Sequence, residues 1–448
     1  MSETERLIES VKELLGGGRD ERLAALLEDA HAADVASIIR ELAPLDQIHV
    51  FRLLSAEHAG AVLSELDDST ARELLQALDE TEVTRVLGRM PAERVVETLE
   101  ELPKEESDKI LELMEEEKSE EVQELLTYGK GTAGRLMSSD FVAVHEGASV
   151  GEAIEHIRKS KSGDDAFYLY VVDGHDHLVG LVPLHRLLTA DPAASIHEIR
   201  TEEVPSVTVD TDQEEVARLV QRYDLLQVPV VDANRRLLGS ISVDDIIDVI
   251  QKEATEDIQR LAGVAGDETV LDPPRAVFPR RLVWLLINLA TAILASSVVG
   301  LFESSIQTLA VLAVFMPIVA SMGGIGTTQT ATVVVRGLAL GDLTPGVAGR
   351  VLLKELRLGL TTGAANGLVI AAIAYVWKGQ LLLSLILGIA LVLNMLVAAV
   401  FGTLVPIALK AFRIDPAIAS SVIITTFTDV FGFFSFLGLA TLLMKFLL

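Results

Sequence analysis

The spacing of apolar residues changes along this 448-residue chain and divides it into three kinds of structure. Up to about residue 130, apolar residues recur at intervals of three and four, as in Val35, Ile38 and Leu42. This is the period of amphipathic helices. Breaks such as the one at Pro91 interrupt it irregularly, so we expect residues 1–130 to form short helices stacked as an acidic α-superhelix.

An internal repeat with a period of about 60 residues follows and predicts two α/β units, over 131–197 and 198–255. Each unit has a strand, an amphipathic helix and an apolar strand, Phe167–Val172 in the first unit and Gln227–Val231 in the second. A polar turn, another strand and a terminal helix complete each unit. The stretch Val230–Ile247 is similar to cystathionine-β-synthase (CBS) domains, and the first unit is a looser copy. The resemblance implies tandem α/β CBS domains.

The rest of the chain is apolar and predicts a membrane domain over 271–448, joined to the repeat by an amphipathic connecting helix within 244–270. Five apolar stretches are long enough to cross about 30 Å of hydrocarbon at about 1.5 Å per residue. They lie near 282–301, 306–336, 356–377, 381–409 and 417–444. We therefore expect a multidomain membrane protein with an α-helical cytosolic superhelix, tandem CBS domains and a five-span α-helical transmembrane domain.

Charge is distributed unevenly along the chain. Residues 1–270 carry 26 Lys/Arg and 59 Asp/Glu, whereas residues 271–448 carry 11 and 6. The acidic front disfavours nucleic acid and anionic lipid as partners and favours cations. The chain contains no cysteine, which excludes disulfides and thiolate zinc sites. No zinc-protease, phosphate-loop or nucleophile-elbow pattern occurs, so we expect no enzyme.

Basic residues near the ends of the predicted spans set the expected orientation. Arg280, Arg281, Arg336 and Lys410 fall on the same side as the front half, which begins without an apolar signal segment. Such residues are enriched on the cytoplasmic side, so we expect a multi-pass plasma-membrane protein with cytoplasmic N-terminal domains. Five spans then place the C-terminus outside, where Lys445 is a minor exception.

The last predicted span carries one acidic residue, Asp429, next to three threonines. A carboxylate in hydrocarbon is unfavourable unless it faces water, protein or an ion. Asp429 is therefore either a structural group, paired for example with Arg336, or a carboxylate of an ion pathway. Two copies at a dimer axis would suit a hydrated divalent cation such as Mg²⁺, which takes oxygen ligands and keeps several waters.

The second predicted span contains Met316-Pro317 and the run Gly323–Gln329, rich in small residues. Proline and glycine interrupt helical hydrogen bonding and free carbonyl groups, which is tolerated at membrane depth beside protein or water. The run is therefore either part of a pathway or a site of close helix packing.

The connecting helix carries carboxylates at spacings of three and four residues, where they share one face. Like charges at these spacings repel unless a cation intervenes. This face is either simply solvated or a cation sensor, and its position between the CBS pair and the membrane favours a sensor. The residues are Asp245, Asp248, Glu253, Glu256 and Asp257.

Three further motifs have structural interpretations. The stretch Thr211–Glu214 is typical of a helix start with a capping box. Asp415-Pro416 is typical of the N-cap and first residue of the fifth span. His175-Asp176-His177 has the spacing of metal ligands, but it follows Asp173-Gly174 and is interpreted as a hairpin turn.

The order of these parts resembles the MgtE family of magnesium channels over essentially the whole chain. The resemblance implies a homodimer with its pore on the dimer axis. It also implies that cytosolic domains bind intracellular Mg²⁺, after which the connecting helix acts as a plug that closes the pore. The stretches that carry the resemblance are Tyr128–Met137, Thr211–Val216, Val228–Val249, Glu253–Leu261, Val333–Leu340 and Thr426–Leu439.

The resemblance also implies roles for individual residues, with Mg²⁺ both transported and regulatory. The expected pore residues are Asp429, Gly323, Gly326, Gln329 and Ser421. The expected metal ligands are Asp429, Asp415, Asp212, Glu214, Asp224, Asp245, Asp248, Glu253, Glu256 and Asp257, with Glu93 and Glu97 where a family member has Asp.

Two departures from the family pattern affect these expectations. The family usually has Asn after its paired glycines, where this chain has Ile325, so the preference among cations stays open. Some members bind ATP between their CBS domains. The Ser/Thr-x-x-Asp ribose signature is present as Ser242…Asp245 in the second unit, but the first unit has Pro183…Arg186. ATP is therefore a candidate ligand, but only one of the two CBS-like units carries the signature.

Other functions stay open at this point. One is a channel for another divalent cation such as Co²⁺ or Ca²⁺. A second is a CBS-gated anion channel, although those resemble longer membrane domains that precede their CBS pair. A third is a membrane-anchored nucleotide sensor without transport, in which Asp429 would be replaceable without loss of flux.

Overall fold

The chain folds into two compact units, Met1–Ile250 and Gln251–Leu448. Helix α16 (Val243–Leu261) begins in the first unit and ends in the second. The computed structural model describes residues 3–100, 102–160, 166–270, 272–418 and 421–447.

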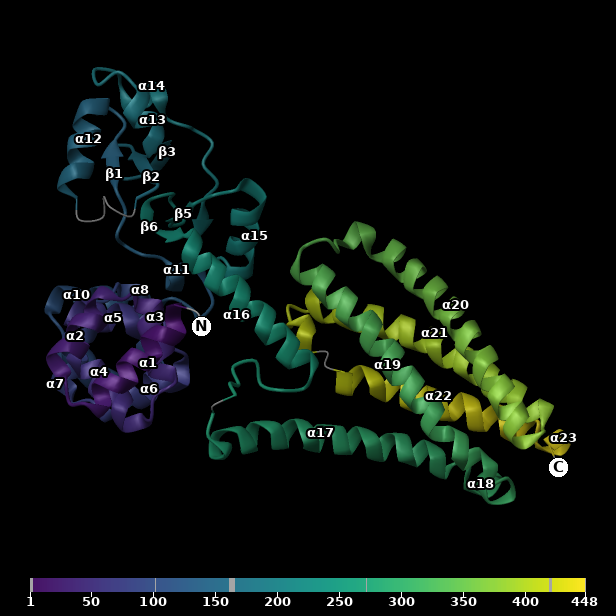
Figure 1. The fold of residues 1–448 in the computed structure, drawn as a ribbon. Helices are drawn as coiled ribbons and strands as arrows, with labels where there is room; N and C mark the ends of the chain where they lie inside the picture. Colours follow the sequence, from purple (N-terminus) through teal and green to yellow (C-terminus); the bar gives the residue numbers. More distant parts are fainter. Residues whose placement is uncertain (1–2, 101, 161–165, 271, 419–420, 448) are drawn as a thin grey trace. The chain divides into compact units, whose positions relative to one another are not determined.

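The N-terminal helices α1–α10 form the predicted α-superhelix, coloured purple to blue in Figure 1. They pack in two rows, because most helices contact the one after next, as α1 contacts α3 and α2 contacts α4. Their inward faces supply buried side chains such as Val35, Ile38 and Phe51. The helices are α1 (Glu3–Gly16), α2 (Asp20–Asp29), α3 (Ala32–Arg40), α4 (Pro44–Leu53), α5 (Ala56–Ser64), α6 (Asp68–Ala77), α7 (Glu80–Leu87), α8 (Ala92–Glu100), α9 (Lys104–Leu113) and α10 (Glu116–Thr127).

The two predicted α/β units are confirmed as pseudo-copies with the same topology. In each, the first strand pairs in parallel with the second, and the second pairs antiparallel with the third. The first unit contains β1 (Ala143–His145), α12 (Val150–Lys159), β2 (Tyr168–Val172), β3 (Leu178–Pro183), α13 (Leu184–Thr189) and α14 (Ile196–Ile199). The second contains β4 (Val207–Thr208), α15 (Gln213–Tyr223), β5 (Gln227–Val231), β6 (Leu237–Ser242) and the start of α16.

The segment that leads into the first α/β unit packs against the second one. It contains the short helix α11 (Ala133–Leu136), which sequence periodicity did not predict. Ser138 and Ser240 exchange two backbone hydrogen bonds of 2.9 Å. One apolar core runs from the superhelix through this segment into the second unit, whereas the first unit has a core of its own. The superhelix and the second α/β unit therefore share a packed interface.

The C-terminal unit contains the five predicted spans, each a single helix long and apolar enough to cross a membrane. The spans are α17 (Pro274–Gly300), α19 (Val311–Ala339), α20 (Pro345–Lys378), α21 (Leu381–Ala411) and α22 (Ser421–Leu442). The shorter elements are α18 (Glu303–Thr308), the 3₁₀ turn η2 (Pro416–Ile418) and α23 (Met444–Leu447), of which α18 was predicted as part of the second span.

Glycines let α20 and α21 approach closely. A Cβ on Gly359 would lie 2.8 Å from the Met395 carbonyl oxygen, and one on Gly367 would lie 2.8 Å from that of Gly388. Contacts this short exclude any larger side chain, so the stripe of small residues brings two backbones together.

Three local predictions were wrong in detail. Pro317 does not interrupt the second span, because α19 continues through it; one missing N–H removes only one bond from a long helix. Asp212, not a capping box at Thr211, caps α15, because its Oδ1 accepts from Glu214 N at 2.9 Å. Asp415 caps η2 rather than α22, since its Oδ1 accepts from Ala417 N at 2.8 Å.

Candidate functional site

Asp429 lies in α22 as a half-buried carboxylate. It makes no hydrogen bond or ion pair with any residue that the structure describes, so no neighbouring helix compensates its charge. The adjacent threonines do not help, because Thr426 and Thr428 donate to carbonyl oxygens of their own helix at 2.8 Å. Arg336, the alternative partner, instead acts electrostatically on Asp257. Among the described residues, Asp429 therefore has no structural pairing partner.

A shallow groove with a mostly apolar lining follows the exposed face of α19, with hydroxyl and amide groups at Ser321, Thr328 and Gln329. It has a volume of about 690 Å³. Gly324 in this face packs against Thr425, with 3.6 Å from its Cβ position to Thr425 Cγ2. Thr425 and Asp429 are four residues apart in α22 and share a face, so the groove runs beside the Asp429 side of α22. Its lining residues are Ser321, Gly324, Ile325, Thr328, Gln329, Thr332 and Val333.

The expected pore residues lie in different surroundings. Gln329 is exposed in the groove. Gly323 and Gly326 are buried against α21, where an added Cβ would clash with Asn394 at the first and lie 2.8 Å from Met395 at the second. The side chain of Ser421 lies outside the described residues.

Asn394 was missed by sequence reasoning. It is fully buried in α21 and donates from Nδ2 to the Val319 carbonyl oxygen at 2.9 Å. Gly323 and Gly432 both pack against its side chain, so one amide joins α19, α21 and α22 a single turn from Asp429. A lone amide within a strongly apolar span was the available signal.

Glu355 in α20 is the second residue that was missed. Only 3% of it is exposed. Its Oε2 accepts from the Thr330 hydroxyl at 3.2 Å, and Lys354 Nζ lies 2.9 Å from its Oε1. Unlike Asp429, this intramembrane carboxylate is compensated within the chain, which indicates a structural role.

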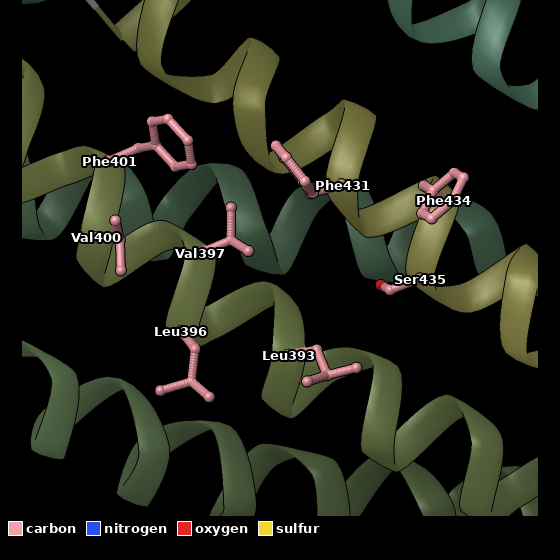
Figure 2. A pocket seen from close by; sticks show the side chains of 8 residues that line it. All are labelled: Leu393, Leu396, Val397, Val400, Phe401, Phe431, Phe434 and Ser435. Carbon is pink, nitrogen blue, oxygen red and sulfur yellow. The ribbon is translucent and has the colours of Figure 1, made fainter.

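A second groove lies between α21 and α22 and is almost entirely apolar. Figure 2 shows leucine, valine and phenylalanine side chains around it, with Ser435 as the one hydroxyl among them. It offers no set of oxygen ligands, so it suits hydrocarbon and not a hydrated cation. Its lining residues are Leu393, Leu396, Val397, Val400, Phe401, Phe431, Phe434 and Ser435.

The membrane end of α16 meets η2 in an acidic cluster. Arg260 forms ion pairs with Glu256 and Asp415. Burial, together with the charges of Asp415 and Glu253, raises the pKa of Asp257 to about 6. Burial also raises the pKa of Glu256. Arg260, together with Arg336 acting on Asp257, therefore compensates only part of the charge of four carboxylates.

A second acidic cluster joins α8 of the superhelix to the start of α16. Arg94 Nη2 donates to Asp245 Oδ1 at 2.9 Å and to Asp248 Oδ2 at 3.2 Å, while Nη1 donates to Glu97 at 3.2 Å. Glu93 lies beside them, and burial, reinforced by the Asp245 charge, raises its pKa to about 7. Burial likewise raises the pKa of Asp245. The expected ligands thus meet as predicted, around an arginine that was not predicted.

The remaining expected ligands lie at the two ends of α15. Asp212 is its exposed N-cap, and Glu214 lies in its first turn. Asp224 is the exposed C-cap in the left-handed conformation, with φ of 52°. Both Asp residues have structural roles there that do not require an ion.

Ser242 and Asp245, which form the half of the ATP signature that is present, already make hydrogen bonds within the protein. The Ser242 hydroxyl donates to Asp245 Oδ2 at 2.5 Å, and the other oxygen of Asp245 accepts from Arg94. In the first unit, Arg186 donates to the Ile199 carbonyl oxygen at 3.0 Å. A ribose hydroxyl at Asp245 would therefore compete with Arg94.

Comparison with known families gives matches along most of the chain. Residues 316–439 match MgtE, described as a divalent cation transporter, and residues 30–131 match the MgtE intracellular N domain. Residues 133–193 and 196–252 match CBS domains.

Similar proteins agree with these matches. The chain is 37% identical over 321 residues to the magnesium transporter MgtE of Thermus thermophilus, covering 71% of each protein. It is 33% identical over 317 residues to the magnesium transporter MgtE of Bacillus subtilis, covering 70% of each. A solved structure of the cytosolic domain of the Mg²⁺ channel MgtE in complex with ATP has a TM-score of 0.52 and 34% identity, and covers 54% of this chain and 99% of that chain.

Proposed function

Because the chain belongs to the MgtE family of magnesium transporters, we propose that it carries Mg²⁺ across a cell membrane and that cytosolic Mg²⁺ closes its pathway. The observation that carries this proposal is Asp429, a half-buried carboxylate in α22 without a partner among the described residues. An uncompensated carboxylate at membrane depth requires water or a cation. A hydrated Mg²⁺ ion supplies both.

The pathway lies on the axis of a homodimer in this proposal. The groove of α19, which carries Ser321, Thr328 and Gln329, runs beside the Asp429 side of α22 and is not covered by other helices of the same unit. A second copy would enclose it and bring two Asp429 carboxylates to one ion. We place the acidic domains in the cytoplasm and the C-terminus outside, in agreement with the basic residues at the span ends.

Closure depends on the two acidic clusters. At low cytosolic Mg²⁺, carboxylates that Arg94 and Arg260 leave uncompensated repel one another, which favours the open state. Mg²⁺ bound near them, together with Asp212, Glu214 and Asp224, would stabilise the closed state. A shift from mostly open to mostly closed requires about 5 kcal/mol of differential binding, so several weak sites must act together and closure should depend steeply on Mg²⁺.

ATP is the second ligand in this proposal, at the CBS pair. The ATP complex of the similar cytosolic domain supports it, and so does the Ser242…Asp245 signature. Because Asp245 also pairs with Arg94, ATP and the superhelix would compete for the same carboxylate.

Transport of another divalent cation is the main alternative, since Ile325 stands where the family usually has Asn. Flux of Mg²⁺ in competition with Co²⁺ or Ca²⁺ separates the two. A nucleotide sensor without transport predicts no Mg²⁺ flux at all.

Replacing Arg94 by glutamine should loosen the superhelix from the second CBS domain when Mg²⁺ is absent. The guanidinium is 21% exposed and contacts three carboxylates, which would be left repelling one another. Removing one partner of a mostly buried ion pair is strongly destabilising. We expect protease cleavage between α10 and β1 to become about tenfold faster, equivalent to about 1.4 kcal/mol, and millimolar Mg²⁺ to restore protection.

Limited proteolysis of the full-length protein measures this effect. Arg89→Gln, an exposed arginine near the same helix, serves as the control and should cleave like the wild type. Equal cleavage of Arg94→Gln and wild type without Mg²⁺ would show that Arg94 does not hold the interface.

Glu93 should make the cytosolic unit less stable as pH rises. Its pKa rises from 4.5 to about 7 on folding, so the folded state retains the proton longer than the unfolded state. The resulting penalty is absent below pH 4.5, grows as pH increases, and is complete above pH 7. Glu93→Gln should therefore stabilise the protein at pH 8 by at most about 3 kcal/mol, with a smaller gain at pH 5.

Thermal unfolding of full-length Glu93→Gln at both pH values tests this dependence. Glu105→Gln, at an exposed position of the same superhelix, is the matched control and should change little. A gain that is the same at both pH values would rule out ionisation of Glu93 as its cause.

A further inference from the structure

The polar turn between β2 and β3 brings three metal-ligand side chains together, and none of them belongs to an acidic cluster. Ligand atoms of Asp173, His175 and His177 all lie within 4.8 Å of one another. No other group of three such residues was found in the described part of the chain. The two imidazole rings lie side by side, with centroids 5.8 Å apart and planes 26° apart.

The turn holds these groups in a fixed arrangement. Asp173 Oδ1 accepts from the backbone N–H groups of His175 and His177, at 2.8 and 3.0 Å. Asp173 Oδ2 lies 2.9 Å from Nδ1 of His177. Zinc binds histidine nitrogen and carboxylate oxygen at about 2.0–2.2 Å, which sets tetrahedral ligand atoms about 3.4 Å apart. The two atoms would therefore separate by about 0.5 Å to hold an ion between them. The ion would replace the hydrogen atom that Asp173 and His177 share. The neutral imidazole of His177 would then carry its proton on Nε2.

The second α/β unit provides an internal comparison. Asp232 Oδ1 accepts from the backbone N–H groups of Asn234 and Arg236, both at 2.8 Å. This is the same turn as at Asp173, and it forms with no histidine. The aspartate alone is therefore sufficient for the turn, and the two histidines of the first unit are not needed to fold it.

We propose that Asp173, His175 and His177 form a binding site for a divalent transition-metal ion such as Zn²⁺. Two imidazoles and one carboxylate suit Zn²⁺, Ni²⁺ or Co²⁺, whereas Mg²⁺ prefers a shell of oxygen ligands. Three protein ligands leave a further position for water on this exposed turn.

The site lies where the two CBS units pair with each other. His177 forms a β-bridge with Arg236, and Leu178 N donates to the Arg235 carbonyl oxygen at 2.9 Å. Arg236 Nε also donates to the carbonyl oxygen of His175 at 3.2 Å. Metal binding would therefore fix one side of this junction and stabilise the CBS pair.

Zn²⁺ binding to the full-length protein, purified in detergent with its affinity tag removed, tests the proposal. Equilibrium dialysis is carried out with Mg²⁺ in large excess, so that oxygen-ligand sites are occupied. We expect one Zn²⁺ per chain that Mg²⁺ does not displace. His175→Gln and His177→Gln should each weaken binding at least tenfold, as loss of a metal-site residue does, and the double variant should lose the ion.

Asn234→Ala, at the position of the second unit that is equivalent to His175, is the matched control and should keep the ion. Absence of tight Zn²⁺ from the wild type, or equal binding by the double histidine variant, overturns the proposal. Either result leaves Mg²⁺ transport untouched, because these residues belong to neither the pathway nor the acidic clusters.

Discussion

Replacing Asp429 by alanine should lower Mg²⁺ flux by at least about a hundredfold. At an effective dielectric constant of about 20, a carboxylate about 4 Å from an ion contributes about 4 kcal/mol per unit charge. A loss of only about 2.7 kcal/mol in the barrier gives a hundredfold change. No described residue compensates Asp429, so its charge is available to the ion. The measurement is Mg²⁺ uptake into proteoliposomes that contain equal amounts of folded protein.

Two companion variants make the result specific. Asp342→Ala removes an exposed acidic residue between α19 and α20 and should leave flux unchanged. Asp429→Asn keeps the shape of the side chain but not its charge, so flux should fall nearly as far as in Asp429→Ala. Normal flux through Asp429→Asn would show that charge at this position is not used.

Neutralising Asp245 and Asp248 together should weaken inhibition by cytosolic Mg²⁺ while the pathway still conducts. These carboxylates face α8 through Arg94, and the pKa of Asp245 is already raised by burial. Without them, Mg²⁺ loses ligands that favour the closed state. Coupling energies of about 1–3 kcal/mol are typical of such sites, so we expect the half-inhibiting Mg²⁺ concentration to rise by about tenfold. Current through reconstituted membrane patches measures it.

The control for this pair is Glu203→Gln with Asp210→Asn, two exposed carboxylates in the second α/β unit. It removes the same charge at other positions and should leave inhibition unchanged. Equal inhibition of wild type and Asp245→Asn/Asp248→Asn would assign those residues to the solvated surface.

Periodicity predicted the elements well, because burial selects apolar residues at fixed intervals. It predicted the superhelix, both α/β units and all five spans, with β5 at Gln227–Val231 as predicted. Short elements such as α11 and α18 were missed, since four to six residues are too few to show a period.

Site residues were predictable where a polar residue interrupts an apolar stretch. They were not predictable where two interacting residues are far apart in the sequence. Asp429 stands out as an acid in an apolar span. Arg94 pairs with Asp245 across 151 positions, and no local pattern reveals that contact. Asn394 and Glu355 were missed because their roles depend on hydrogen bonds to α19, which the sequence does not reveal.

Mg²⁺ current through the reconstituted full-length protein, recorded while Mg²⁺ on the cytosolic face rises through the millimolar range, tests the central claim most directly. The account predicts that current falls steeply, with more than first-order dependence on Mg²⁺, because several acidic sites close one pathway. A current that persists unchanged as cytosolic Mg²⁺ rises would contradict it.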